Sequence, residues 1–381
     1  MKNYILLFTV QLCAAFSIAI LSVTLISVVH NNNGSVSVLM LTMTLPSIFF
    51  SRIIGDFFDK DKSRRFFSFA ILFELFLLTA VLVGSLFRLN MFIYLFAFFT
   101  FYIQIFVDLL LQTTVTHIAK AKHYLKFNSI LSLVENIGII IGPILGGYFV
   151  YRNNLNIVII IAFLLYILIL ISAFFLKPSK ADIVEKSMPD ELSAVKTSIK
   201  IPKLKTIFYS IALFSFAISI INVMQISFII EQFNTNELGF GLTESAWGAG
   251  MAVGAFVVLL LYKKFSYKLI FGSSYIIIGL AVFVLLIGHN FYFALILFLL
   301  IGTGNCIISI VSTTMIQQTA SADVIGKSLR IKSMFFNVSS LLAMTITGFL
   351  EWTVPPIWLF MAAGVIFLMG GILNLVRVQQ S

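Results

Sequence analysis

The stretch Ser51–Phe66, with the sequence SRIIGDFFDKDKSRRF, joins two long apolar runs. Six charged residues are crowded into its second half, which are Asp59, Lys60, Asp61, Lys62, Arg64 and Arg65. A segment this short has room only for a tight loop, so the chain reverses direction here. Apolar runs of about 20 residues cross a bilayer as helices. The stretch therefore predicts a hairpin of two membrane helices whose turn lies at the membrane surface.

The composition indicates that the whole chain is built in this way. Of its 381 residues, 60% are hydrophobic and only 10% are charged, which is more apolar surface than a soluble core can bury. We predict an all-α membrane protein with twelve transmembrane helices, because open strands leave backbone groups unsatisfied in lipid. The predicted spans are 4–29, 36–54, 66–87, 91–115, 128–150, 156–176, 206–230, 246–262, 269–288, 291–315, 331–352 and 357–376.

The basic residues predict the orientation of these spans. With both termini in the cytoplasm, 23 of the 25 lysines and arginines fall in inner loops and tails, and only Arg88 and Arg152 fall outside. Lysine and arginine are enriched on the cytoplasmic side of membrane proteins. We therefore expect a multi-pass protein of the cell inner (cytoplasmic) membrane. The net charge of +10 is explained by this topology and by anionic lipid, so it gives no reason to expect nucleic acid as a partner.

The longest polar segment divides the spans into two sets of six. Residues 177–205 contain Pro178, Pro189 and Pro202 with charges of both signs and no apolar run, as is typical of a linker. We expect an N-terminal six-helix bundle over residues 1–176, a cytoplasmic linker over 177–205, and a C-terminal six-helix bundle over 206–381.

Residues that would support catalysis or metal binding are sparse. Cys13 and Cys306 lie in separate spans, and the four histidines have no ligand spacing. No Gly-x-x-x-x-Gly-Lys-Ser/Thr loop is present for nucleotide binding. We expect no metal, no cofactor and no enzymatic activity.

The charged turn resembles a known motif. Its Gly55, Asp59, Lys60, Arg64 and Arg65 resemble the loop between the second and third helices of the major facilitator superfamily, although Lys62 and Ser63 replace the usual Gly-Arg. The resemblance implies two six-helix bundles with a substrate site between them near the bilayer midplane. It also implies that ion pairs in this loop hold one rigid half against the other.

A second motif lies in the fifth span. Gly138, Gly142, Pro143, Gly146 and Gly147 follow a Glu-Asn pair, and together they resemble the fifth helix of drug exporters in this superfamily, as in macrolide efflux proteins and the enterobactin exporter. The resemblance implies antiport. Glycines permit close helix contact, and we expect their partners in the eighth span, at Gly248, Gly250 and Gly254.

Acidic side chains within spans are candidates for proton coupling, since a carboxyl in a low-dielectric cavity can load and release protons. Asp108, one turn after Gln104, is the first candidate. Alternatively, it forms a salt bridge with Arg52. It could have both roles if this salt bridge breaks during the transport cycle. Glu135 is expected to be buried, as a second protonatable site or as a structural hydrogen-bonding group. Glu74 is expected to form a structural pair or to stay protonated.

Polar side chains on the helices that the resemblance places around the cavity are candidates for substrate contact. These are Gln11, Gln104, Asn222, Gln225 and Asn305. No acid or base is expected deep in spans seven to twelve. With so few charges, the cavity suits a large amphipathic ligand.

We therefore expect a monomeric secondary transporter that exports an amphipathic organic compound in exchange for protons, surrounded by membrane lipid. The compound would be drug-like, a macrolide or a siderophore. Two alternatives stay open: a carrier of lipid or lysolipid, and a sensor or immunity protein that binds a compound without transporting it.

Overall fold

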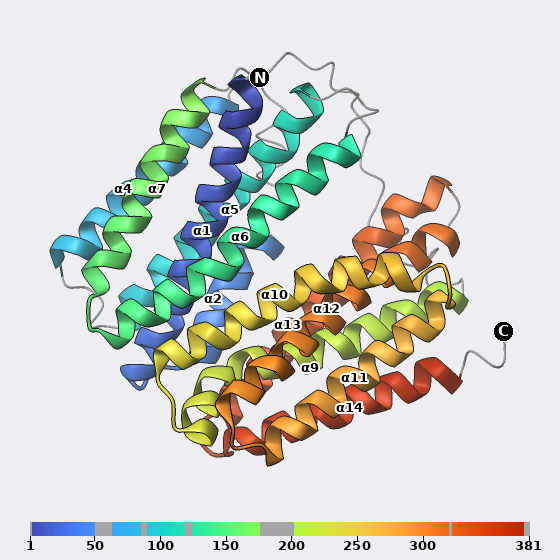
Figure 1. Cartoon of the computed structure of the whole chain (residues 1–381). Helices are drawn as coiled ribbons and strands as arrows, with labels where there is room; N and C mark the ends of the chain where they lie inside the picture. Colours follow the sequence, from blue (N-terminus) through green and yellow to red (C-terminus); the bar gives the residue numbers. More distant parts are fainter. Residues whose placement is uncertain are drawn as a thin grey trace. The chain divides into compact units, whose positions relative to one another are not determined.

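The computed structural model describes residues 2–49, 63–84, 90–118, 124–175, 202–319 and 322–376. These residues form twelve α-helices and no strand (Figure 1). The helices are α1 Lys2–Asn31, α2 Val36–Phe49, α4 Ser63–Gly84, α5 Asn90–Ile118, α6 Tyr124–Tyr151, α7 Leu155–Phe175, α9 Pro202–Phe233, α10 Glu237–Leu261, α11 Tyr267–Ile287, α12 Phe291–Thr319, α13 Ala322–Leu350 and α14 Pro356–Val376. Each expected span corresponds to one helix, so the all-α membrane class is confirmed.

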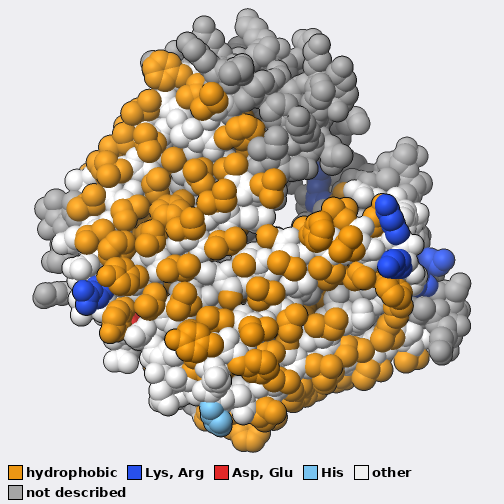
Figure 2. Space-filling model, in the orientation of Figure 1, with side chains coloured by type: hydrophobic (Ala, Val, Ile, Leu, Met, Phe, Trp, Pro, Cys, Tyr) orange, Lys and Arg blue, Asp and Glu red, His pale blue; other side chains and the backbone are white. Residues whose placement is uncertain are grey.

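Most of these helices have the length and composition of membrane spans. Within the described ranges, nine are long and apolar enough to cross a bilayer, and shorter apolar stretches lie at Val36–Pro46, Ser68–Val81 and Met91–Ile105. Figure 2 shows a face on which hydrophobic side chains predominate and charged ones are few. An apolar exterior of this kind is compatible with the hydrocarbon core of a bilayer.

Two helices begin nine residues earlier than hydropathy predicts. Helix α10 starts at Glu237 instead of residue 246, because the side-chain oxygen of Asn236 accepts hydrogen bonds from the backbone nitrogens of Leu238 and Gly239 at 3.1 and 3.3 Å and caps the helix. Helix α13 starts at Ala322 instead of residue 331. The added turns are more polar than the spans, and apolar run length does not detect them.

The chain divides into two compact units. Unit 1 comprises residues 1–184 and 235–245, and unit 2 comprises residues 185–234 and 246–381. Helix α10 thus contributes its first turns to unit 1 and the remainder to unit 2. Most of the expected linker, residues 177–201, lies outside the described residues, and the expected bundle boundaries stay a prediction.

Helix α1 forms the centre of unit 1. It packs against α5, α6 and α7, and its side chains are buried along most of its length, including Leu7, Val10, Ile20, Leu25 and Val29. Helix α4 packs against α5 and α7, and α2 packs against α5.

Helix α9 has the central position in unit 2, where it packs against α13 and α14. Aromatic rings reinforce this packing: Phe228 stacks on Phe360 with ring centroids 4.0 Å apart. The buried hydroxyls of Ser219 on α9 and Ser340 on α13 are joined by a hydrogen bond of 2.8 Å. Such pairs hold membrane helices together where the hydrophobic effect between them is weak.

Candidate functional site

The charged turn that resembles the superfamily loop falls largely outside the described residues. Four of its residues are not described at all: Arg52, Gly55, Asp59 and Lys60. Arg64 and Arg65 belong to the first turn of α4, but their side chains are not described. Their roles stay predictions.

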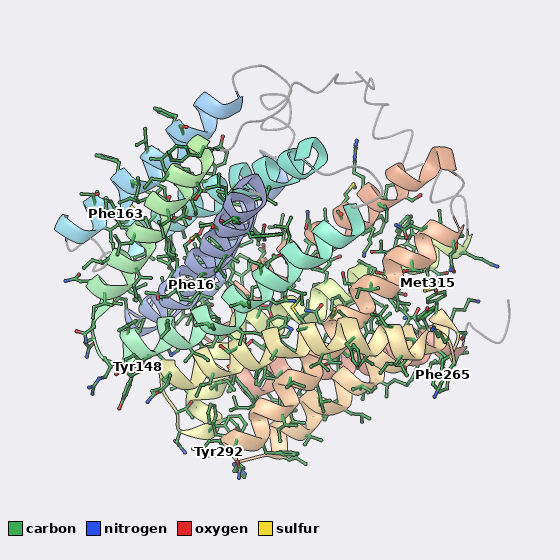
Figure 3. All side chains as sticks on the ribbon, turned by 45° about the horizontal axis from the view of Figure 1, so that its top comes forward. Phe16, Tyr148, Phe163, Phe265, Tyr292 and Met315 are labelled. Carbon is green, nitrogen blue, oxygen red and sulfur yellow. The ribbon has the colours of Figure 1, made fainter. Side chains whose placement is uncertain are left out.

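Three glycines of α6, which are Gly138, Gly142 and Gly146, pack against α1. A Cβ atom added to Gly138 would lie 2.7 Å from the backbone nitrogen of Phe16, and one added to Gly142 would lie 2.7 Å from the Cβ of Ala19. One added to Gly146 would lie 2.8 Å from the carbonyl oxygen of Ile20. Figure 3 labels Phe16 on α1, close to α6. The glycines therefore let α6 and α1 approach until their backbones are in van der Waals contact.

The expected partners in the eighth span have other neighbours. Gly250 and Gly254 of α10 lie against Leu299 and Thr303 of α12, so pairing them with the α6 glycines was wrong. The physical reason is that the α6 glycines meet the backbone of α1 and its small side chains Ala15 and Ala19, so the partner helix needs no glycine of its own.

A separate contact joins α6 to the first turns of α10 within unit 1. Gly147 lies directly against the backbone of Glu237, and Gly241 lies directly against the carbonyl oxygen of Pro143. The Glu237 carboxylate also accepts a hydrogen bond of 2.7 Å from the side-chain amide of Asn31 on α1. The motif residues Pro143 and Gly147 thus form the part of α6 that contacts α10.

The two acidic coupling candidates differ in how the structure places them. Asp108 lies in α5, but its side chain is not among those described. The side chain of Glu135 on α6 is exposed, which differs from the burial expected for it. Glu135 lies one turn before Gly138, the first α6 glycine that contacts α1.

Glu74 is the acid that the structure buries completely. It lies at the middle of α4 with no exposed surface, and its Oε1 accepts a hydrogen bond of 2.8 Å from Thr100 Oγ1 on α5. Its Oε2 is buried without a hydrogen-bond partner among the described residues. Burying a charge with a single neutral donor is expensive, so this environment favours the neutral acid. Glu74 therefore joins the candidates for a proton site.

The amide side chains expected at the cavity are placed in both units. Gln11 on α1 and Gln104 on α5 are half-buried in unit 1. In unit 2, Gln225 on α9 is fully buried, and Asn222 and Asn305 are half-buried. The Oδ1 atom of Asn222 is buried and has no hydrogen-bond partner within the described part of the chain. The structure brings Asn222 and Asn305 onto helices that pack together, α9 and α12.

Unit 2 carries a base near the start of one of its spans. Lys332 lies on α13 in the apolar stretch Ser328–Leu350, and its ammonium donates hydrogen bonds to α12 at Ser309 O (3.0 Å) and Thr313 Oγ1 (2.7 Å). A signal for this polar contact was present in the sequence: Asn305, Ser309 and Thr313 recur every four residues and mark a polar side of α12.

No group of three His, Cys, Asp or Glu side chains that could hold a metal ion occurs in the ranges that the structure describes. The polar residues placed above are amides, hydroxyls, single acids and a single base. They can bind a ligand by hydrogen bonds and exchange protons, which is the chemistry of a transport site.

Comparison with known proteins gives the same result. The model of the family described as Major Facilitator Superfamily matches residues 7–327 and 207–380. An uncharacterized MFS-type transporter of Bacillus subtilis (strain 168), YfmI, is 24% identical over 265 residues, which cover 67% of this chain and 64% of that protein. The match thus spans less than two thirds of the relative's own length.

Solved structures show the same fold at low identity. The nucleoside transporter NupG superposes with a TM-score of 0.78 at 11% identity, covering 99% of this chain and 98% of that one. A bacterial homologue of the iron transporter ferroportin gives a TM-score of 0.75 at 13% identity, with 98% of each chain covered. Given the family match, the helical fold and the polar groups in its spans, the chain belongs to the Major Facilitator Superfamily and is a multi-pass membrane transporter.

Proposed function

We propose that this transporter exports an amphipathic organic compound in exchange for protons, by alternating access in the cytoplasmic membrane with both termini in the cytoplasm. The compound would be drug-like, a macrolide or a siderophore. The Asn222 side chain is the observation that carries the ligand part of this proposal. Its buried Oδ1 lacks a partner among the described residues. An unsatisfied buried acceptor costs about 1–3 kcal/mol, so a ligand donor placed there would be favourable.

The surroundings of Asn222 support an amphipathic ligand. Neighbouring positions on α9 are apolar, including Ile221, Val223 and Ile226, while Gln225 and Asn305 add amides. A ligand pocket of mostly apolar surface with a few placed polar groups suits a molecule of mixed character. The same composition does not suit a small, strongly hydrated solute.

The proton part of the proposal is supported by acids within the spans. Glu74 is buried beside Thr100 in unit 1, and Asp108 lies two turns beyond Thr100 along α5. Ionisable groups inside membrane proteins are costly and mark ion and proton pathways. The glycine motif of α6, which resembles that of antiporters, points in the same direction.

Transport assays on purified protein in liposomes test this function. Macrolides, lipophilic cations, siderophores and lysolipids are each added outside, and their accumulation is followed with and without a pH gradient. We expect one class to be moved in a gradient-dependent way, and Asn222→Ala to raise its half-saturating concentration about tenfold. Selective movement of lysolipid would favour a lipid carrier. Binding without movement of any class would favour a sensor or immunity protein.

A further inference from the structure

Lys332 is held against a neighbouring helix instead of extending freely. Its Nζ donates to the carbonyl oxygen of Ser309 at 3.0 Å and to Thr313 Oγ1 at 2.7 Å. Thr313 Oγ1 in turn donates to the same carbonyl at 2.9 Å. The three groups form a closed triangle of hydrogen bonds between α13 and α12. Both acceptors are neutral, so they fix the position of the ammonium but do not neutralise its charge.

The ammonium retains capacity for a ligand. A lysine has three N–H donors, and the triangle uses two of them. The side chain is half-buried, so part of it is reachable. A half-buried cation whose partners are neutral attracts anions more strongly than a cation in water does, because the surrounding dielectric is lower.

The side of α12 that meets Lys332 is polar along several turns. Asn305, Ser309, Thr313 and Gln317 recur at intervals of four, which places them along one side of the helix. Ser309 and Gln317 are exposed, and Asn305 and Thr313 are partly exposed. Asn305 lies about 6 Å along the helix from Ser309, at 1.5 Å per residue. Its amide can therefore donate to a group that Lys332 also contacts.

Such a surface is not suited to contact with lipid tails. Charged and polar side chains within membrane spans almost always face a bundle interior or a water-filled cavity. The polar side of α12 together with Lys332 is therefore accessible from water. Since this surface presents a cation and an amide donor, its complement is an oxyanion.

We propose that Lys332, with Asn305, binds the oxyanion group of an amphipathic molecule, a carboxylate, sulfonate or phosphate, and that this molecule is the transported compound. This inference rests on the proposed function, and it narrows the substrate class from amphipathic compounds to amphipathic organic anions. A membrane lipid with an anionic headgroup offers the same chemistry from a second source.

A matched pair of fluorescent probes distinguishes binding that depends on the ligand's charge from binding through apolar contact alone. 8-Anilinonaphthalene-1-sulfonate carries a sulfonate, and N-phenyl-1-naphthylamine has the same ring skeleton without it. Both are titrated against the full-length protein in phosphatidylcholine nanodiscs, with the signal of empty nanodiscs subtracted. We expect saturable binding of the sulfonate that is about 10- to 100-fold weaker in Lys332→Met, as for loss of one hydrogen bond to a charged group.

Two further variants make the result specific. Lys332→Arg keeps the charge and should bind the sulfonate within a few-fold of the wild type. Lys264→Met removes an exposed charge in the turn after α10 and should leave binding unchanged. Binding of the uncharged probe should be alike in all four proteins, which also shows that each one is folded.

Several outcomes would overturn the inference. Equal sulfonate binding by wild type and Lys332→Met would remove Lys332 from ligand recognition, as would saturable sulfonate binding by neither protein. Loss of sulfonate binding when the nanodiscs contain phosphatidylglycerol would assign the site to lipid headgroups instead of the substrate. The proposed function is tested separately, because gradient-dependent transport by the unmodified protein in liposomes does not require that sulfonate binding depend on Lys332.

Discussion

Enlarging Gly142 should force α6 away from α1 and destabilise unit 1. A Cβ atom at Gly142 would lie 2.7 Å from the Cβ of Ala19 and 3.0 Å from the backbone nitrogen of Ile20. Ordinary contact begins at 3.4 Å, so the first added carbon alone requires a shift of 0.7 Å, the difference between 3.4 and 2.7 Å. Neither contact is with the flexible end of a side chain, so the backbone of α1 has to move.

The expected loss of stability follows from this overlap. Overpacking a well-packed interior typically costs about 1–3 kcal/mol. For a unit of this size, each kcal/mol lowers the unfolding midpoint by roughly 2–4 °C. We expect Gly142→Ala to lower the midpoint by about 2–12 °C, and Gly142→Leu, with three more carbons, to lower it further.

The two cysteines of the chain provide an assay specific to this helix pair. Cys13 lies on α1 with only 5% of its surface exposed, and Cys306 lies in unit 2. In a Cys306→Ala background, Cys13 is the one remaining thiol, and its reaction with a maleimide during heating reports the release of α1. Separation of α1 from α6 should raise the labelling rate at temperatures where the parent protein stays protected.

A glycine elsewhere supplies the control. Gly288 caps α11, with φ at −80°, and a Cβ atom there would have Val284 O as its nearest neighbour at 3.2 Å. Gly288→Ala requires a shift of only 0.2 Å, the difference between 3.4 and 3.2 Å, so it should change the midpoint much less than Gly142→Leu and leave the Cys13 labelling rate unchanged. If Gly142→Leu also matched the parent in both measurements, the close packing of α6 on α1 would not be a structural requirement.

Further predictions concern buried polar pairs. Glu74→Gln should preserve the thermal midpoint, because an amide carbonyl can accept the hydrogen bond from Thr100, whereas Thr100→Val should lower stability by about 1 kcal/mol; a large loss in Glu74→Gln would argue for an ionised side chain. Ser219→Ala and Ser340→Ala should each cost about 1–2 kcal/mol by leaving one buried hydroxyl unpaired, while the double variant should cost less than their sum. Simple additivity of the midpoint shifts would show that this hydrogen bond contributes nothing.

The helical fold could be predicted from the sequence because lipid imposes a strong constraint. Apolar runs of span length and the one-sided distribution of lysine and arginine specify how many helices there are and in which order they occur. Helix ends were less predictable. The start of α10 depends on the cap supplied by Asn236, and a cap is a local hydrogen-bond pattern that hydropathy does not measure.

Helix partners could not be predicted in the same way. The α6 glycines were expected to meet glycines, yet they pack against Ala15, Phe16 and Ala19 of α1. A face of small residues predicts that another helix packs closely against it, but it does not predict which helix that is. Lys332 was expected at the cytoplasmic end of its span, and hydropathy did not indicate that it is held by Ser309 and Thr313 of another helix.

The exchange of protons for substrate is the claim that most needs a direct test. Purified protein is placed in liposomes with a pH gradient and an internal pH-sensitive dye, and the compound that the transport assay identifies is added. We predict that the compound collapses the gradient only when protein is present, and that Asp108→Asn or Glu74→Gln stops this collapse while the compound still binds. An intact gradient during measured transport of the compound would contradict proton coupling, and the same experiment with a sodium gradient would then identify a sodium-driven carrier or a facilitator.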